Sequence, residues 1–452
     1  MYTNYYFIGI GGIGMSAIAR YFKYIGMNVS GYDRTPSPLT KKLEEEGIEV
    51  HYEDRPDLIP INVDKTFVIY TPAIPASLKE LQYVKENGYT LCKRSRALGE
   101  IARDKDCLAV SGTHGKTTTS TLLAHIFTAG TEDGCTAFLG GISKNYHSNL
   151  LRSTSDALVA EADEFDRSFL QLRPQIAVVT EVDADHLDIY GTHDEVRKAF
   201  SDFTAQVKKD GAVIIKKGVE FDRSRITAKQ YTYSYNEPCD FYASDIRPVQ
   251  GGYFNFTLNY PGGRIADCTV GVPGWVNVEN AVAASAVALL YGVQPLKVRA
   301  ALATFSGVER RFDIHLNTPE CAYIDDYAHH PNEIAAAISS LRNIFAGRKI
   351  CGIFQPHLFT RTRDFADEFA AALSNLDELI MLPIYPAREL PIEGVNAEMI
   401  LDKVTIPNKM LVQKEQLLET IASRDIDCLV TFGAGDVDRF VKPIEELLKN
   451  RQ

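Results

Sequence analysis

The chain has 452 residues, enough for about three domains that each bury a hydrophobic core. Its hydrophobic fraction of 45% and charged fraction of 24% are ordinary for a folded globular protein and exclude a disordered or fibrous one. The 48 basic and 59 acidic side chains give a formal net charge of -11, which excludes a general affinity for nucleic acid or anionic membranes. A phosphate-bearing ligand must therefore be bound by a local group of residues.

The cysteine pattern and the apolar runs predict a cytoplasmic protein. Eight cysteines are scattered without a C-x-x-C pair, which favours reduced thiols over a disulfide framework. The apolar run over residues 7–19 follows no basic residue and contains four glycines, so we do not interpret it as a signal peptide. The run over 281–293 is interrupted by serine and tyrosine and is too short to span a bilayer.

The first segment, residues 1–95, opens with a predicted βαβ unit. A strand over 5–10 enters the loop Gly9-Ile-Gly11-Gly12-Ile13-Gly14, a helix follows to about residue 24, and a strand over 28–32 ends before Asp33. This G-x-G-x-x-G spacing, with an acidic residue about 20 positions later, is typical of a dinucleotide site. A strand over 65–70 and a helix over 78–87 complete a Rossmann-like domain.

The second segment, residues 96–306, begins with a strand that breaks into Gly112-Thr113-His114-Gly115-Lys116-Thr117-Thr118 and then a helix. Backbone N–H groups at such a turn bind phosphate oxygens, the lysine neutralises the outer phosphates, and the threonine hydroxyl can hold Mg²⁺. The loop is a shorter variant of the strict pattern, because Val110 stands five residues before Gly115. We interpret it as an ATP site; the alternative is an ordinary glycine turn with a solvated lysine.

Acidic residues follow the next two predicted strands of this segment. Glu161 comes directly after a strand over 157–160, where a P-loop enzyme places an acid that holds Mg²⁺. Glu164 and Asp166 compete for that role, and a solvated turn that caps a helix is the alternative for all three. His186, after a strand over 176–180, has the surroundings of a metal ligand or a polar substrate contact, with a structural histidine as the alternative.

The rest of the second segment is predicted to add strands and then helices. A helix covers about 195–207, and a β-rich stretch over 212–272 with short polar turns predicts an antiparallel extension. Two helices, 280–291 and 296–304, close the segment. The prediction is a P-loop ATPase domain with a mixed sheet.

The third segment, residues 307–452, alternates strands and helices and predicts a second Rossmann-like domain. The predicted strands cover 321–325, 349–354, 378–382, 410–412 and 428–432. Ligands of such sheets bind at the carboxyl ends of strands, which here carry Asp325-Asp326-Tyr-Ala-His329-His330 and Gln355-Pro-His357. Arg310 and Arg311 at the segment joint can reach phosphate oxygens or merely be solvated, and Arg361 and Arg363 form a possible anion cradle.

These motifs, in this order and over essentially the whole chain, resemble those of the Mur ligases. The resemblance rests on the two glycine loops, the stretch from Glu161 to Leu170, Asp185-His-Leu-Asp188, Asp325-Asp-Tyr-Ala-His-His-Pro331 and Phe354-Gln-Pro-His357. It implies a UDP-sugar domain, a central ATPase domain and a C-terminal domain that closes over ATP and the amino acid. It also implies ATP and Mg²⁺, with UDP-N-acetylmuramate and L-alanine as substrates, joined through an acyl phosphate in peptidoglycan precursor synthesis.

The resemblance also assigns roles to residues. The catalytic residues would be Lys116, Glu161, His186 and Arg311. Thr117 and Glu161 would hold the ATP-linked Mg²⁺, and His186 would hold a second metal. Besides the phosphate loop, the nucleotide would contact Asn277, Asn280, Arg311 and Asp326. The UDP-sugar and amino acid would be bound by Gly11, Gly12, Ile13, Gly14, Met15, Ser16, Asp33, His329, His330, His357 and Arg361.

Three positions depart from the pattern common in the family. Asparagine is usual where Glu181 stands, histidine where Val276 stands and arginine where Leu358 stands. The first adds a carboxylate near the metal site, the second removes a ring contact to the nucleotide, and the third puts one anion contact in doubt.

Other functions stay open. A ligase that adds a tripeptide to the same UDP-sugar has a similar layout, whereas an NAD-dependent oxidoreductase would explain the first glycine loop but not the second. An ATP-binding regulatory protein would bind nucleotide without turnover. No coiled-coil pattern is present, and we expect a monomer or a weak homodimer.

Overall fold

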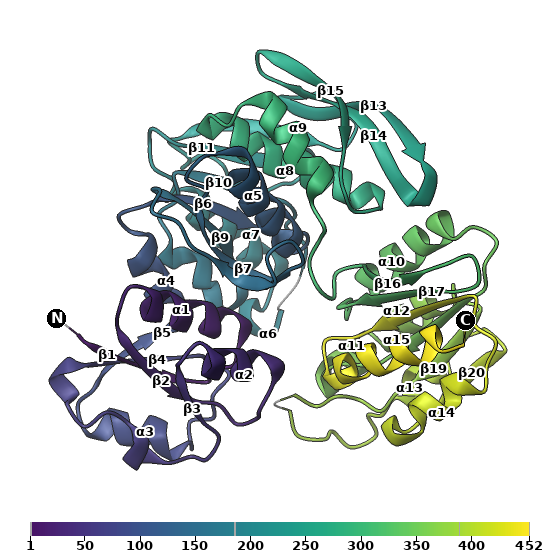
Figure 1. The fold of residues 1–452 in the computed structure, drawn as a ribbon, viewed down its shortest axis with the longest axis horizontal. Helices are drawn as coiled ribbons and strands as arrows, with labels where there is room; N and C mark the ends of the chain where they lie inside the picture. Colours follow the sequence, from purple (N-terminus) through teal and green to yellow (C-terminus); the bar gives the residue numbers. More distant parts are fainter. Residues whose placement is uncertain (1, 185–186, 388, 452) are drawn as a thin grey trace. The chain divides into compact units, whose positions relative to one another are not determined.

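The computed structural model describes residues 2–184, 187–387 and 389–451 and divides into two compact units (Figure 1). The first unit comprises Met1–Pro248, Tyr253–Val272 and Val276–Gly307, and the second comprises Val249–Gly252, Pro273–Trp275 and Val308–Gln452. Three sheets with flanking helices confirm the predicted α/β class. The predicted boundary at residue 95 falls within helix α4 (Arg94–Ala102), and the domain boundaries stay predictions.

The first sheet is parallel and has the order β3-β2-β1-β4-β5. Its strands are β1 (Asn4–Ile8), β2 (Asn28–Tyr32), β3 (Glu49–His51), β4 (Thr66–Tyr70) and β5 (Thr90–Lys93). Its helices are α1 (Ile13–Tyr24), α2 (Pro38–Glu45), α3 (Lys79–Glu86) and α4. Strand order reverses between β1 and its neighbours β2 and β4, so the first glycine loop lies at a topological switch point.

The second sheet is mixed, as predicted, and has the order β15-β14-β13-β12-β11-β10-β6-β9-β7-β8. Its strands are β6 (Asp106–Ser111), β7 (Thr136–Ser143), β8 (Ser148–Leu151), β9 (Ala157–Ala162), β10 (Ile176–Val179), β11 (Ala212–Lys216), β12 (Lys229–Ser234), β13 (Phe241–Val249), β14 (Tyr253–Tyr260) and β15 (Gly263–Thr269). The helices are α5 (Lys116–Gly130), α6 (Leu187–Tyr190), α7 (His193–Thr204), α8 (Trp275–Tyr291) and α9 (Pro295–Thr304). The central strands are buried on both faces, which explains the unbroken apolar run of β6.

The prediction of an antiparallel extension over 212–272 is wrong for its first part. β11 pairs in parallel with β10 and β12, and β12 pairs in parallel with β13, whereas β14 and β15 form an antiparallel hairpin. The physical reason is the length of the connections. α7 joins β10 to β11, and a segment of about a dozen residues joins β11 to β12, which suffices for the crossover that parallel pairing requires.

The third sheet, in the second unit, has the order β16-β17-β21-β18-β19-β20 and is parallel except for β16. Its strands are β16 (Asp313–Asn317), β17 (Ala322–Asp326), β18 (Ile350–Phe354), β19 (Glu378–Met381), β20 (Asn408–Leu411) and β21 (Cys428–Phe432). Its helices are α10 (Pro331–Ile344), α11 (Phe359–Asp364), α12 (Ala366–Leu373), α13 (Glu398–Leu401), α14 (Leu417–Ala422) and α15 (Val441–Lys449).

The structure bears on the predictions of reduced thiols and of no membrane-spanning segment. All eight cysteines are free, and all but Cys239 are buried. Within the described residues, no helix is both long enough and apolar enough to cross a membrane.

Polar contacts join the first two sheets inside the first unit. Asn149, in β8, is fully buried, and its amide donates to the carbonyl of Ile13 (2.6 Å) and the hydroxyl of Ser16 (2.9 Å) in α1. Arg20 of α1 in turn donates to Asn149 (2.9 Å) and Ser148 (2.9 Å). These bonds fix the helix that follows the first glycine loop against the sheet that carries the phosphate loop.

Replacing Asn149 should destabilise the first unit. In Asn149→Ala, buried polar groups of α1 lose their partner, and we expect the free energy of unfolding to fall by about 2 kcal/mol. Asn28→Ala, which removes an exposed amide pair with Asn4, is the control and should change it by less than about 0.5 kcal/mol. Urea unfolding of both variants measures this; equal effects would show that the link contributes nothing special.

Candidate active site

The phosphate loop occupies the turn between β6 and α5. Gly112 has a φ of 134°, and a Cβ there would lie 2.0 Å from the hydroxyl of Thr180, so a side chain cannot be accommodated. Gly115, with a φ of 78°, is the N-cap of α5, whose first turn contains no acidic residue. The loop therefore presents a helix N-terminus without a carboxylate of its own, a suitable environment for phosphate.

Residues after β10 hold the loop in place. The Thr180 hydroxyl donates to the carbonyl of Ser111 (3.1 Å), and the Thr113 N–H donates to the carbonyl of Glu181 (3.0 Å). The Asp183 N–H donates to the Thr113 hydroxyl (3.2 Å), and the Asp183 carboxylate lies 3.3 Å from the ring of His114. The loop is thus bonded on one side before any ligand arrives.

Lys116 forms a buried ion pair with Glu164. Its ammonium donates to both carboxylate oxygens (2.8 Å each) and to the carbonyl of Gly112 (2.7 Å). Burial disfavours the charge on Lys116, but Glu164, Asp163 and Glu161 outweigh it and raise the pKa of the ammonium. Burial also raises the pKa of Glu164, and the charge of Lys116 offsets only part of that effect. The lysine therefore stays protonated at the place where phosphate would bind.

Thr117 and Glu161 lie together. The Thr117 hydroxyl donates to Glu161 (3.1 Å), which also accepts the N–H of Gly140 (3.2 Å). Glu161 lies inside β9, which extends two residues beyond its predicted end. Among residues 2–184, 187–387 and 389–451, no three His, Cys, Asp or Glu side chains gather as a metal site, and His186 lies outside these residues.

The asparagines of α8 lie beside the phosphate loop. This helix begins at Trp275, five residues before its predicted start, so Val276, Asn277 and Asn280 belong to its first turns. Asn280 accepts a hydrogen bond from the Thr119 hydroxyl (3.1 Å) and donates to Asn277 (3.3 Å). The Asn280 amide oxygen would lie 3.0 Å from a Cβ at Gly115, so this side chain is close to the loop backbone. Thr118, the last of the predicted loop residues, is half-buried.

The first glycine loop has buried and accessible parts. The Gly11 N–H donates to the Asp33 carboxylate (2.8 Å), so Asp33 is bonded to the loop itself. Met15 and Ser16 are buried, with the Ser16 hydroxyl donating to the carbonyl of Ile13 (3.0 Å). A ligand on this loop would meet Gly11, Gly12, Ile13 and Gly14, which are at least partly exposed.

Arg94, which is not among the predicted site residues, lies between the first glycine loop and Asp163. A Cβ at Gly14 would lie 2.7 Å from its guanidinium, which also reaches Asp163 at 3.5 Å. Asp166 and Arg167, just beyond, have φ values of 52° and 55°, a left-handed conformation uncommon outside glycine. The signal for Arg94 was present in the sequence, since two successive cations at a strand-to-helix turn are unfavourable without an anion.

In the second unit, the two arginines of the joint have different environments. Arg310 donates to the fully buried Asp325 (3.1 Å) and to the carbonyl of Gly433 (2.7 Å). The guanidinium of Arg311 lies 4.9 Å from the centre of the Tyr327 ring. Arg310 thus holds the fold, which is compatible with a ligand contact by Arg311.

The predicted histidines gather at the carboxyl edge of the third sheet. The rings of His329 and His357 lie 6.0 Å apart, His357 stacks on Tyr385 at 5.8 Å, and Arg361 approaches His357 at 3.5 Å. The backbone N–H groups of His329 and His330 both donate to Glu333 (3.0 and 3.2 Å).

Burial changes the ionisation of two groups at this edge. It raises the pKa of Asp326 to about 7, although the Ala328 N–H bonds to the carboxylate. It lowers the pKa of His329 to about 4, although Glu333 at 3.6 Å favours the charged ring. Leu358, where an arginine is common, has a φ of 73° at the N-cap of α11.

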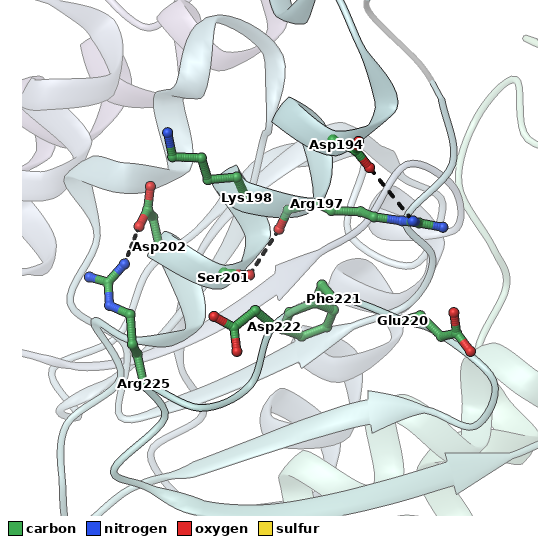
Figure 2. Close-up of a pocket in the computed structure, with 9 residues that line it drawn as sticks. All are labelled: Asp194, Arg197, Lys198, Ser201, Asp202, Glu220, Phe221, Asp222 and Arg225. Atoms are coloured by element: carbon green, nitrogen blue, oxygen red, sulfur yellow. Dashed lines mark hydrogen bonds and ion pairs between the residues drawn. The ribbon is translucent and has the colours of Figure 1, made fainter.

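A cavity of about 560 Å³ lies elsewhere in the first unit, between α7 and residues 220–225 (Figure 2). Its charged side chains bond partly to one another, as Arg225 does to Asp202 and Arg197 to Asp194 (Figure 2). None of the predicted site residues lines it, and its mixed charges favour neither anion nor cation.

Comparisons with known proteins agree with the resemblance. Three family models match in order: "Mur ligase family, catalytic domain" (residues 4–106), "Mur ligase middle domain" (110–288) and "Mur ligase, glutamate ligase domain" (310–435). The UDP-N-acetylmuramate--L-alanine ligase of Parabacteroides distasonis is 53% identical over 99% of this chain and 97% of its own length.

Solved structures confirm the three-domain fold. That of the UDP-N-acetylmuramate-alanine ligase of Thermotoga maritima matches with a TM-score of 0.85 and 27% identity, covering 99% of this chain and 100% of the other. A murein peptide ligase of Psychrobacter arcticus matches with a TM-score of 0.75 over 99% of both chains, but at 21% identity it shows the fold alone.

The low pKa of His329 predicts that its ring stays neutral in mildly acidic solution. Because the ordinary value is 6.5 and the folded value about 4, the unfolded chain takes up a proton between these pH values that the folded protein does not. This residue should therefore cost stability as pH falls from 6.5 toward 4. NMR of the His329 ring should show no titration down to about pH 5; a midpoint near 6.5 would contradict the burial argument.

Proposed function

The chain belongs to the Mur ligase family, and from this we propose that it is the ATP-dependent ligase that joins L-alanine to the lactyl carboxylate of UDP-N-acetylmuramate. Its products are ADP, phosphate and the amide, a precursor of peptidoglycan. The relatives with this printed name match over nearly the whole chain at high identity. The NAD-dependent alternative is set aside, because it leaves three ligase domain models and the phosphate loop unexplained.

The observation that carries the proposal is the buried Lys116 at the phosphate loop. Its ammonium is held by one carboxylate and one carbonyl at the N-terminus of α5. In this proposal, ATP phosphates replace Glu164 as the partner of Lys116. The lysine then offsets the negative charge on the transferring phosphoryl group, where such charges contribute most.

A carboxylate is a poor electrophile, so the lactyl carboxylate must first be activated. An oxygen of the lactyl carboxylate attacks the γ-phosphorus of ATP, the bond to ADP breaks, and an acyl phosphate forms. The neutral amine of L-alanine attacks the acyl carbon, loses a proton, and the carbon–oxygen bond breaks as phosphate leaves. The residues of this chain bind and orient these groups, with Lys116 at the phosphates.

We also propose that Thr117 and Glu161 hold Mg²⁺ together with ATP. Mg²⁺ usually binds one or two carboxylates, substrate phosphates and water, so a hydroxyl beside a single carboxylate fits it. When bound, the ion would neutralise phosphate charge. A second metal at His186 stays a prediction, as do the contacts of Asn277 and Asn280, the residues at the first glycine loop and those of the second unit.

Two further properties of the protein also stay predictions. These are the cytoplasmic location and the monomer or weak homodimer. The tripeptide-adding alternative is tested by substrate choice.

Turnover tests the proposed function directly. Phosphate release from ATP should require both UDP-N-acetylmuramate and L-alanine, and Lys116→Ala should lower kcat at least about 100-fold. Lys105→Ala is a matched control, because this lysine binds Asp156 at the opposite end of β6 and should leave turnover unchanged. Release with a tripeptide but not with alanine would favour the recycling ligase, and release with neither would contradict the proposal.

Removing one Mg²⁺ ligand should raise the metal requirement. In Glu161→Gln, the weaker amide oxygen should raise the Mg²⁺ concentration for half-maximal turnover about tenfold, with the affinity for UDP-sugar unchanged. A titration of turnover with Mg²⁺ at saturating ATP measures the change. An unchanged midpoint would remove Glu161 from the metal site.

A further inference from the structure

Three charged side chains outside the proposed mechanism meet beside the phosphate loop. The ammonium of Lys216, the last residue of β11, lies 2.9 Å from the carboxylate of Glu181 and 3.1 Å from that of Glu279. Glu181 follows β10 and Glu279 belongs to α8, so this Lys216 cluster joins three elements. All three side chains are at most 30% exposed, and burial strengthens charge interactions.

The cluster is bonded to the loop on two sides. The carbonyl of Glu181 accepts the N–H of Thr113, so one member of the cluster is hydrogen-bonded directly to the loop backbone. Glu279 precedes Asn280, which accepts the Thr119 hydroxyl of α5. A change in the charge of the cluster therefore acts on residues that are hydrogen-bonded to the loop and to α5.

The charges explain what Lys216 does there. Two carboxylates and one ammonium give the cluster a formal charge of about -1, and loss of the lysine would make it about -2 next to a polyphosphate. Burial disfavours the charged lysine, but Glu181 and Glu279 outweigh it and raise its pKa, so it stays protonated. The extra carboxylate at position 181, where the family commonly has asparagine, is thus compensated within this chain.

We propose that Lys216 is a positioning residue for the nucleotide. It offsets part of the negative charge of Glu181 and Glu279 and thereby lets the phosphate loop accept a polyphosphate. This role rests on the proposed function, because it requires that the loop binds ATP.

Calorimetric binding of ADP with Mg²⁺ to the full chain tests the proposal without turnover. Lys216→Met should raise the Kd for ADP about tenfold, and the effect should shrink at high salt because charge repulsion is screened. Lys217→Met is the matched control, since the neighbouring Lys217 pairs with Glu237 at 2.8 Å on the exposed surface and should not change the Kd. The KM for UDP-N-acetylmuramate should stay the same in both variants.

A charge-restoring variant separates this role from a structural one. Glu181→Gln combined with Lys216→Met returns the cluster to its original charge, and the Kd should come back to within about threefold of wild type. Glu181→Gln alone keeps the bond from Lys216 to Glu279 and should tighten ADP binding, so it decides the matter if Lys216→Met does not fold.

An unchanged Kd in Lys216→Met or in Glu181→Gln, or no recovery in the double variant, would overturn the proposal. Wild-type protein that binds no ADP would instead refute the proposed function. The two failures are therefore distinct.

Discussion

The active site depends on one constraint, which is that the phosphate loop must keep a protonated lysine buried before any phosphate arrives. A lone ammonium in that place would be costly, and Glu164 removes the cost by a two-oxygen ion pair at 2.8 Å. In the proposed function, Glu164 both stabilises Lys116 and can be exchanged for another anion. The phosphate oxygens of ATP take the place of the Glu164 carboxylate there, and the lysine is already in position.

Charge balance extends outward from this pair. Lys216 pairs with two glutamates beside the loop, and Arg94 lies between the first glycine loop and Asp163. The buried Asn149 then ties the helix of the first loop to the second sheet. The two glycine loops, which are far apart in sequence, thus lie in one compact unit, as the proposed reaction between UDP-sugar and ATP needs.

Local patterns predicted the parts of the site that are local in space. The turn with Gly112, Gly115 and Lys116 could be predicted because its backbone requires glycine. Glu161 could be predicted because it directly follows the apolar residues of its strand. Contacts between elements that are distant in the sequence could not be predicted. Nothing near Lys216 indicates its two glutamates, and Glu164 looked like one of several acids in a turn. The prediction that β11 and β12 pair in antiparallel fashion was also wrong, because a run of strands with polar turns does not show whether a crossover connects them.

The central claim is that ATP activates the sugar carboxylate as an acyl phosphate at the phosphate loop. The most direct test uses UDP-N-acetylmuramate whose lactyl carboxylate carries oxygen-18, with ATP, Mg²⁺ and L-alanine. The account predicts that each released phosphate contains one labelled oxygen, because the carboxylate oxygen that attacks phosphorus leaves with it. Unlabelled phosphate accompanied by amide formation would contradict it.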